Sequence, residues 1–242
     1  MKSTLFNSTF FLALIILIGG CTVSTDKANN SNKDAVSEDR SISSFSKLSI
    51  HGVFNLYLSQ GDKESLRIEA DEQTMDKIIT RNDGEQLIIE LEEGFELFDR
   101  DQINIYLTIT DIDSFEFEGV GNIKTETTLR LKDLNLKGDG VGNTKLELEA
   151  DRIDAEFNLV GNLTLSGKVE TINLENNGLG NLDATDLKSQ YMTVESNGIG
   201  SVEVYCQQEI SITANGIGKV TYAGDADVKK LDRSGIGKVE KK

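Results

Sequence analysis

The sequence contains no proline and no tryptophan, and only one histidine and two cysteines among 242 residues. The lone histidine, His51, excludes the usual histidine-based arrangements: there is no Ser/His/Asp set and no Cys/His spacing of a metal site. Basic residues are also scarce, with 25 Lys and Arg against 41 Asp and Glu and a formal net charge of −16. Because binding to nucleic acid requires Lys and Arg to neutralise phosphates, this charge argues against a nucleic-acid partner. We expect His51 to be structural.

The sequence also lacks an apolar run long enough to cross a membrane. Residues 10–18 read FFLALIILI, whereas a bilayer core of roughly 30 Å needs about 20 residues of helix. This run follows a positive Lys2 and precedes Gly-Gly-Cys21, an arrangement that resembles the bacterial lipobox. We therefore predict a lipoprotein signal peptide over residues 1–20 and a lipidated Cys21 that anchors the chain to a membrane. The alternative is an ordinary secretory signal with an incidental cysteine.

Two further predictions follow from this start. Residues 22–40 are polar and nearly free of large apolar groups, so we expect residues 21–40 to form a flexible tether. With Cys21 acylated, Cys206 has no partner for a disulfide. Its alternation with Val204 predicts a small buried residue and not a nucleophile.

What the sequence does have is a repeat of about 19 residues. Motifs such as GVGN and NGIG recur at intervals of 21, 19, 19, 20, 18 and 19 residues. This is the period of a solenoid coil and is too short for a helix-turn-helix repeat. The first motif positions are Gly119, Gly140, Leu159, Gly178, Gly198, Gly216 and Gly235.

Apolar residues within each repeat alternate with period two, as in half-buried strands. The sequence therefore predicts an all-β fold, a single-stranded parallel β-helix whose coils stack at about 4.8 Å. Equivalent residues of successive coils should lie directly above one another. We expect the apolar residue after the first motif position to point into the core in every coil, namely Val120, Val141, Val160, Leu179, Ile199, Ile217 and Ile236.

The residue after this apolar position, the second glycine of the motif, is glycine in every copy. This predicts a positive φ or a close approach by the neighbouring coil. The next position is asparagine in the first four copies, and stacked amides can form a hydrogen-bonded ladder. A row of amides that binds sugar hydroxyls is the functional alternative. The two columns are Gly121, Gly142, Gly161, Gly180, Gly200, Gly218 and Gly237, and Asn122, Asn143, Asn162 and Asn181.

We expect one domain over residues 41–240, regular over 113–240 and less regular over 41–112. The runs SLRIEA, QLIIELEE and QINIYLTIT are strand-like, and NDG at residues 82–84 predicts a tight turn. Residues 71–81 are the one candidate for a short helix.

The motifs together resemble a known family. FSKLSIHGVFNLYLSQGDKESLRIEAD, then DGEQLIIEL, then repeated GVGN and NGIG are similar to the GIN-domain family, over about residues 41–240. Its members are described as heads of autotransporter adhesins and also as a domain of unknown function. The resemblance implies a β-helical surface or envelope protein, commonly a lipoprotein of Bacteroidota-type bacteria, and offers no catalytic residues. Leu159 and the lysines that replace the last asparagines, Lys219 and Lys238, depart from the repeat.

Candidate chemistry is sparse. Glu118 and Asp139 occupy one column one coil apart, and two carboxylates about 5 Å apart repel unless a cation or a proton lies between them, so they are the candidate for a weak Ca²⁺ site. The repeat intervals vary by only three residues, so the loops between coils are too short to form the walls of a cleft. A polysaccharide-active enzyme is therefore the least favoured of the three functional hypotheses.

The last coil is basic, with seven Lys and Arg against four Asp and Glu over residues 219–242. Charge at an open end blocks fibre growth or, alternatively, docks on an acidic partner or another copy.

We therefore predict a non-enzymatic lipoprotein of the cell envelope, without a cofactor, that presents a repetitive face to a glycan or a surface protein. The alternative is a structural or regulatory periplasmic protein whose partner is another protein. Thr22, which follows Cys21, is not an Asp-type retention signal, so the outer membrane is favoured.

Overall fold

The computed structural model describes residues 35–95 and 102–242. The predicted signal peptide, Cys21 and residues 21–34 of the predicted tether lie outside the described residues. The described residues belong to one compact unit with a continuous apolar core. No helix in residues 35–95 or 102–242 is long and apolar enough to span a membrane.

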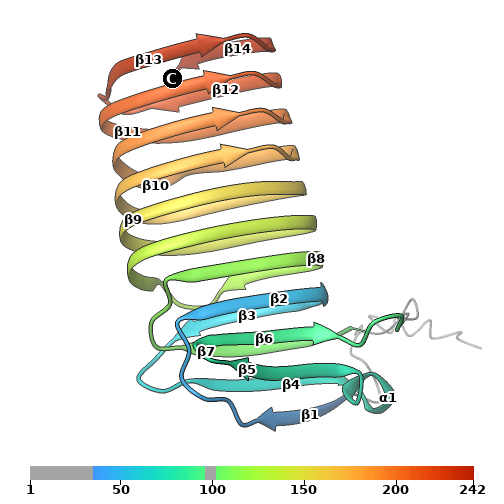
Figure 1. Cartoon of the computed structure of the whole chain (residues 1–242). Coiled ribbons are helices and arrows are strands. Elements are labelled where there is room, and N and C mark those ends of the chain that lie inside the picture. Colours follow the sequence, from blue (N-terminus) through green and yellow to red (C-terminus); the bar gives the residue numbers. More distant parts are fainter. Residues whose placement is uncertain (1–34, 96–101) are drawn as a thin grey trace, which may run out of the picture. The chain divides into compact units, whose positions relative to one another are not determined.

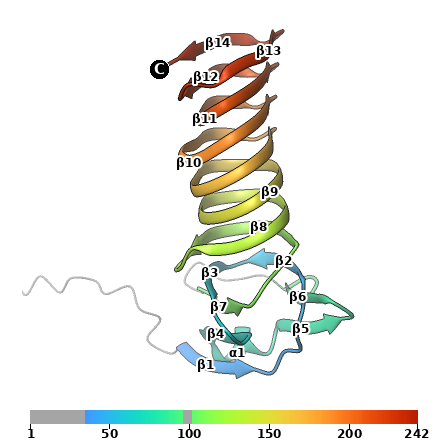
Figure 2. The same ribbon diagram turned by 90° about the vertical axis from the view of Figure 1, so that its left-hand side faces the viewer.

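Residues 114–242 wind into stacked coils of a parallel solenoid (Figures 1 and 2). Each coil pairs in register with the coil before it, so that Val120 lies beside Val141 and Leu179 beside Val160. The strands are long because the chain turns through corners without leaving β geometry. The predicted all-β solenoid is confirmed. Its strands are β8 (Ser114–Thr125), β9 (Leu129–Asn176), β10 (Leu179–Ser196), β11 (Ile199–Ala214), β12 (Ile217–Ala223), β13 (Asp227–Arg233) and β14 (Ile236–Lys241).

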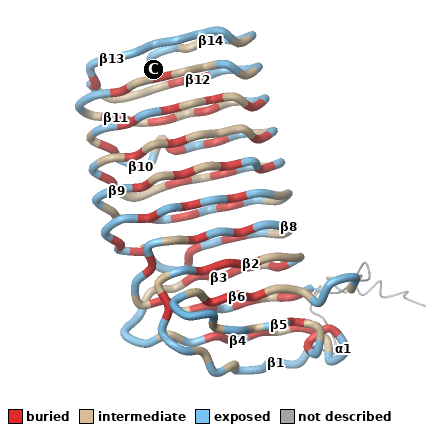
Figure 3. The backbone as a smooth tube through the Cα atoms, in the orientation of Figure 1, coloured by how far each residue is buried: buried red, intermediate tan, exposed pale blue. Residues whose placement is uncertain are grey.

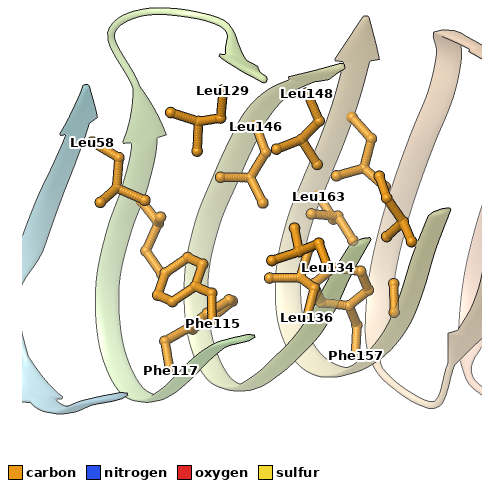
Figure 4. Close-up of a cluster of buried hydrophobic side chains, with 14 of the residues drawn as sticks. Leu58, Phe115, Phe117, Leu129, Leu134, Leu136, Leu146, Leu148, Phe157 and Leu163 are labelled. Atoms are coloured by element: carbon orange, nitrogen blue, oxygen red, sulfur yellow. The ribbon is translucent and has the colours of Figure 1, made fainter. Parts of the chain in front are cut away.

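The core is a narrow column of stacked aliphatic and aromatic side chains between the two walls of the solenoid. Burial alternates along the strands, which follows from the period of two residues per pleat (Figure 3). Phe115, Leu136 and Phe157 are almost inaccessible and lie at successive levels (Figure 4). Because one coil exposes its apolar side until the next coil covers it, stability comes from stacking.

The N-terminal part continues both walls of the solenoid with shorter strands. On one wall β8 pairs with β3 and β3 with β7; on the other wall β8 pairs with β2 and β2 with β6. Antiparallel pairs, β4 with β7 and β5 with β6, make this part less regular than the coils. The strands are β2 (Lys47–Val53), β3 (Asn55–Gln60), β4 (Ser65–Asp71), β5 (Ile78–Asp83), β6 (Gln86–Leu91) and β7 (Asn104–Ile109).

Two local predictions in this part have clear outcomes. The turn between β5 and β6 uses Gly84 at φ 59°, as the NDG signal indicates. The helix α1 is only Glu72–Met75, and Asp71 caps it by accepting hydrogen bonds from the backbone N–H groups of Gln73 and Thr74, both at 3.0 Å. Of the other residues in the predicted helical segment, Asp71 ends β4, Asp76 and Lys77 form a turn, and residues 78–81 begin β5.

The predicted tether is wrong for its last six residues. Ala35–Arg40 forms strand β1, antiparallel to β4. Its side chains carry almost no apolar signal, but its backbone pairs with an edge strand. Arg40 also fixes its end, since the guanidinium donates to the carbonyl oxygens of Met75 and Ile78.

The predicted inward column of Val, Leu and Ile residues is also wrong in direction. Val141, Leu179 and Ile217 lie on a common line, but they are 49%, 47% and 48% exposed. The reason is parity: Phe117 and Ile123 point inward, and an alternating strand between them places Val120 outside. The inward positions of this segment are Gly119 and Gly121.

Candidate binding surface

One edge of the solenoid presents an unbroken row of apolar side chains, which we call the aliphatic ridge. Its members are register partners in successive coils, and each is between 41% and 74% exposed. It follows the right-hand edge of the ribbon in Figure 1, where β2 ends and β10, β11, β12 and β14 begin. The ridge consists of Val53, Val120, Val141, Val160, Leu179, Ile199, Ile217 and Ile236.

Glycines on both sides of most ridge residues explain the sharp edge; the exceptions are Phe54, which follows Val53, and Leu159, which precedes Val160. Gly121 has φ 143° and Gly180 has φ 136°, a region that residues with a side chain rarely adopt. A Cβ at Gly121 would lie 1.8 Å from the carbonyl oxygen of Phe54, and one at Gly180 would lie 1.9 Å from that of Gly161. The backbones of neighbouring coils therefore approach closely at this edge, and only the residue between the two glycines projects.

Leu159 replaces the first glycine in one coil and fills the interior instead. Its side chain is 7% exposed, as expected for an inward position with a side chain. It lines a small cavity of about 30 Å³ under the corner, together with Phe54 and Phe117. The departure from the repeat is thus a packing residue.

Exposure along the ridge shows that its members cover one another. Ile217, which has a neighbour on each side, is 48% exposed, while Ile236 in the last coil is 74% exposed. Stacking therefore covers the flanks of each side chain, and the outer half stays open to solvent. The open halves join into one strip about 34 Å long, from eight coils about 4.8 Å apart.

A ladder of amides runs beside the ridge, two residues further along each coil. The side-chain nitrogen of Asn143 donates to Asn122 at 3.1 Å, and that of Asn162 donates to Asn143 at 3.0 Å. The ladder is longer than the four asparagines of the repeat, because Asn55 donates to Asn104 and Ser201 donates to Asn181. Asn104 lies in the run NIYL, where no glycine motif marks it. In order, the amide ladder contains Asn104, Asn55, Asn122, Asn143, Asn162, Asn181 and Ser201.

A second polar column borders the other side of the ridge. Asn197 donates to Asn177 at 2.9 Å and Asn215 donates to Asn197 at 2.9 Å, and Ser234 ends this row. Towards the N-terminal coils the column becomes acidic, with Asp139 and Glu118. The ridge is thus an apolar strip between two polar borders that are uncharged in the middle coils.

The predicted calcium pair lies in this border. Glu118 and Asp139 are register partners, and Glu118 lies 3.5 Å from His51, whose ring also contacts the hydroxyl of Ser49 at 2.7 Å. Within residues 35–95 and 102–242, no three His, Cys, Asp or Glu side chains are grouped so that they could hold a metal ion. Glu118 and Asp139 are therefore not completed by a third side chain of these types in a metal-binding arrangement.

Arg152, Asp154 and Cys206 lie outside the ridge and its borders. Arg152 donates two hydrogen bonds of 2.8 Å to Asp154 and lowers the pKa of that carboxyl group, with a further contribution from Asn173. Cys206 is free and fully buried, as its alternation with Val204 predicts. Neither arrangement brings a nucleophile and a base together.

Comparison with known proteins identifies the family of this chain. The model of a family described as "Putative auto-transporter adhesin, head GIN domain" matches residues 44–226. The chain belongs to this family. The resemblance seen in the sequence is thereby confirmed, and the family suggests a protein of the cell surface or envelope. None of the curated proteins matches the chain.

Solved structures show the same architecture. A "putative adhesin" from Bacteroides fragilis has a TM-score of 0.83 at 23% identity, covering 87% of this chain and 98% of that one. A "putative lipid binding protein" from Parabacteroides distasonis has a TM-score of 0.68 at 18% identity, and a "putative adhesin" from Parabacteroides merdae has 0.65 at 17%. These cover 87% of this chain and 98% and 97% of theirs. At such identities the likeness shows the fold.

Proposed function

We propose that this chain is a non-enzymatic adhesive module of the cell envelope, which binds through the repeated outer surface of its solenoid. The observation that carries the proposal is the aliphatic ridge with its polar borders. An apolar strip of this extent is as large as the largest patches of monomeric proteins, and such patches are often functional. Membership of the GIN-domain family supports the same reading.

The geometry also bears on the enzyme alternative. Catalysis on a polysaccharide needs acidic or basic groups held beside a cleft at defined separations. From β8 to β14 the coils meet at the ridge in tight glycine corners, so no loop of this part of the chain rises beside it. The borders are mostly amides that already bond to one another. Such a surface can hold a partner by many weak contacts at the coil spacing, which is multivalent binding.

Lipidation of Cys21 and an outer-membrane location are part of the proposal. Several acyl chains would hold the protein stably at a membrane surface, since each buried methylene contributes about 0.8 kcal/mol. The lipobox-like Gly-Gly-Cys21 supports this anchor. The solenoid would then stand on the membrane through its N-terminal segment.

Protease treatment of intact cells tests the proposal. If the full chain is displayed outward, an added protease removes it while a periplasmic marker survives, and cells that lose it adhere less to a glycan- or protein-coated surface. Protection until the outer membrane is permeabilised would contradict display and favour the periplasmic alternative. The variant Cys21→Ser is the control for the anchor and should appear in the soluble fraction. A chain that stays membrane-bound as Cys21→Ser contradicts lipidation.

A further inference from the structure

We infer that the aliphatic ridge docks on the ridge of a second copy of this chain, with the two solenoids antiparallel. The inference deepens the proposed binding function, on which it rests, by naming the partner. It concerns the side of the solenoid and not its open end. Its starting point is that the residue at the tip of the edge is Val, Leu or Ile in all eight coils, although this position is exposed.

Packing inside one molecule does not account for this choice. Neighbouring ridge residues shield each other's flanks, and a β-branched polar residue such as Thr would do so equally well. Yet the outer halves remain open over the whole ridge. They amount to roughly 250–500 Å² of apolar surface, in the range of the largest and often functional patches of monomers. Together with both polar borders, the strip approaches the roughly 800 Å² per partner of a standard interface.

The spacing of the ridge residues favours a second ridge as the binding partner. A straight apolar strip with a side chain every 4.8 Å or so is matched by another strip of the same spacing, because the side chains can then interdigitate along its full length. A second ridge has this spacing by construction. Each inner asparagine of the amide ladder donates one hydrogen bond and accepts one, so it has donor and acceptor capacity left for a bond across such a contact.

Charge favours contact between two copies despite the net charge of −16. In the middle coils the border residues themselves are amides: Asn162 and Asn181 lie on one side, and Asn177 and Asn197 lie on the other. On this second side the nearest carboxylates, Glu175 and Glu195, lie two residues further from the ridge, and each accepts a hydrogen bond from one of these amides. The ridge with its amides is therefore the part of an acidic molecule where two copies meet with the least repulsion. A vesicle with anionic headgroups, by contrast, would meet the acidic surface around it.

Charge also sets the direction. If ridge residues are counted from Val53 as the first to Ile236 as the eighth, Glu118 and Asp139 border the second and third residues. Lys219 and Lys238 border the seventh and eighth on the other side of the ridge, in the column of the amide ladder, and both pair with Glu240. An antiparallel pair places these lysines of one copy at the same end of the contact as Glu118 and Asp139 of the other, whereas a parallel pair would place like charges at the same end. It sets Val120 opposite Ile217 of the other copy.

Sedimentation of the compact unit, residues 32–242, tests the inference. We expect a monomer–dimer equilibrium that weakens at least tenfold in the triple variant Val160→Thr/Leu179→Thr/Ile199→Thr, which keeps β-forming side chains but removes the apolar strip. The matched control is Val36→Thr/Ile79→Thr, since Val36 and Ile79 are 41% and 39% exposed and lie outside the ridge. Thermal unfolding of each variant checks that the fold is retained.

Cross-linking tests the direction. Val120→Cys and Ile217→Cys, mixed under oxidising conditions, should form a disulfide between the two variants, whereas each alone should not; native Cys206 is buried and does not interfere.

A monomer at every accessible concentration, or a triple variant that dimerises like the original chain, would overturn the inference. So would binding to phosphatidylcholine or phosphatidylglycerol vesicles that the triple variant loses, because the ridge would then be a lipid site. Self-linking of each cysteine variant would overturn the antiparallel pairing. None of these outcomes depends on display at the cell surface.

Discussion

The side-chain nitrogen of Asn143 donates to the side-chain oxygen of Asn122 at 3.1 Å, although 21 residues separate them in the sequence. The side-chain oxygen of Asn143 in turn accepts a hydrogen bond of 3.0 Å from the side-chain nitrogen of Asn162. Each inner asparagine is thus both donor and acceptor, and the ladder binds consecutive coils together outside the apolar core. Such chains of hydrogen bonds polarise one another and favour a single register.

Replacement of Asn143 by Ala should break both of these bonds. We expect the free energy of unfolding to fall by about 1–2 kcal/mol, because a neutral hydrogen bond contributes roughly 0.5–1.5 kcal/mol. Denaturant unfolding measures the change. Asn158→Ala is the control, since Asn158 is exposed, lies in the same coil as Asn162 and has no hydrogen bond to its side chain in the described structure. Equal losses in both variants would mean that the ladder does not stabilise the stack.

Spacing alone predicts much of this arrangement from the sequence. Intervals of 18 to 21 residues identify coils, and aligning them predicts which residues lie beside one another. The direction of a side chain needs a further count. Val120 and Ile123 are both apolar, but three positions separate them, so an alternating strand cannot turn both inward. Counting from Phe117 would have placed Val120 outside and revealed the ridge.

Other features leave no such signal. Strand β1 (Ala35–Arg40) is polar, and its order depends on backbone pairing with β4 and on the contacts of Arg40 with distant carbonyl groups. Asn104 joins the amide ladder from β7, which precedes the first regular coil. Both depend on tertiary contacts between segments that do not share the repeat.

Replacing the second glycine of the motif, such as Gly180, should strongly lower the stability of the fold. We expect Gly180→Val to cost more than about 3 kcal/mol, because a side chain there combines an unfavourable φ of 136° with a Cβ 1.9 Å from a backbone oxygen. Gly178→Ala should also be costly, since its Cβ would lie 2.1 Å from the carbonyl oxygen of Leu159, but it adds no positive φ. Gly84→Ala is the control: φ is 59° and nothing lies within 4 Å, so about 1–2 kcal/mol is expected. Melting temperatures that do not follow this order would refute the account of the corner.

Restoring the repeat at its exception should weaken the protein. Leu159→Gly returns the consensus residue, yet it removes a buried side chain beside an existing cavity of about 30 Å³. We expect a loss of about 3–5 kcal/mol, as for large-to-small changes in a core with the added flexibility of glycine. Leu179→Ala, at a half-exposed ridge position, should cost clearly less. A stabilised Leu159→Gly variant would show that the consensus, and not packing, governs this site.

The ion pair of Arg152 and Asp154 should give a small stability term that depends on pH. Arg152 lowers the pKa of Asp154 in the folded chain, so the folded state binds this proton less readily than the unfolded state. The contribution is therefore present above the ordinary Asp pKa of about 4 and is lost as the pH falls through the lower folded value. Because Asp154 is 46% exposed, solvent limits the term to about 1 kcal/mol or less.

Thermal unfolding of the original chain and of Asp154→Asn between pH 7 and pH 2.5 measures this term. The difference in melting temperature should be largest near neutral pH and should shrink towards the acid end, as Asp154 of the original chain takes up its proton. Asp151→Asn is the control, because Asp151 is exposed and has no ion pair in the described structure. A difference between the original chain and Asp154→Asn that persists unchanged at pH 2.5 would mean that the contact with Asn173, at 2.6 Å, matters more than the charge.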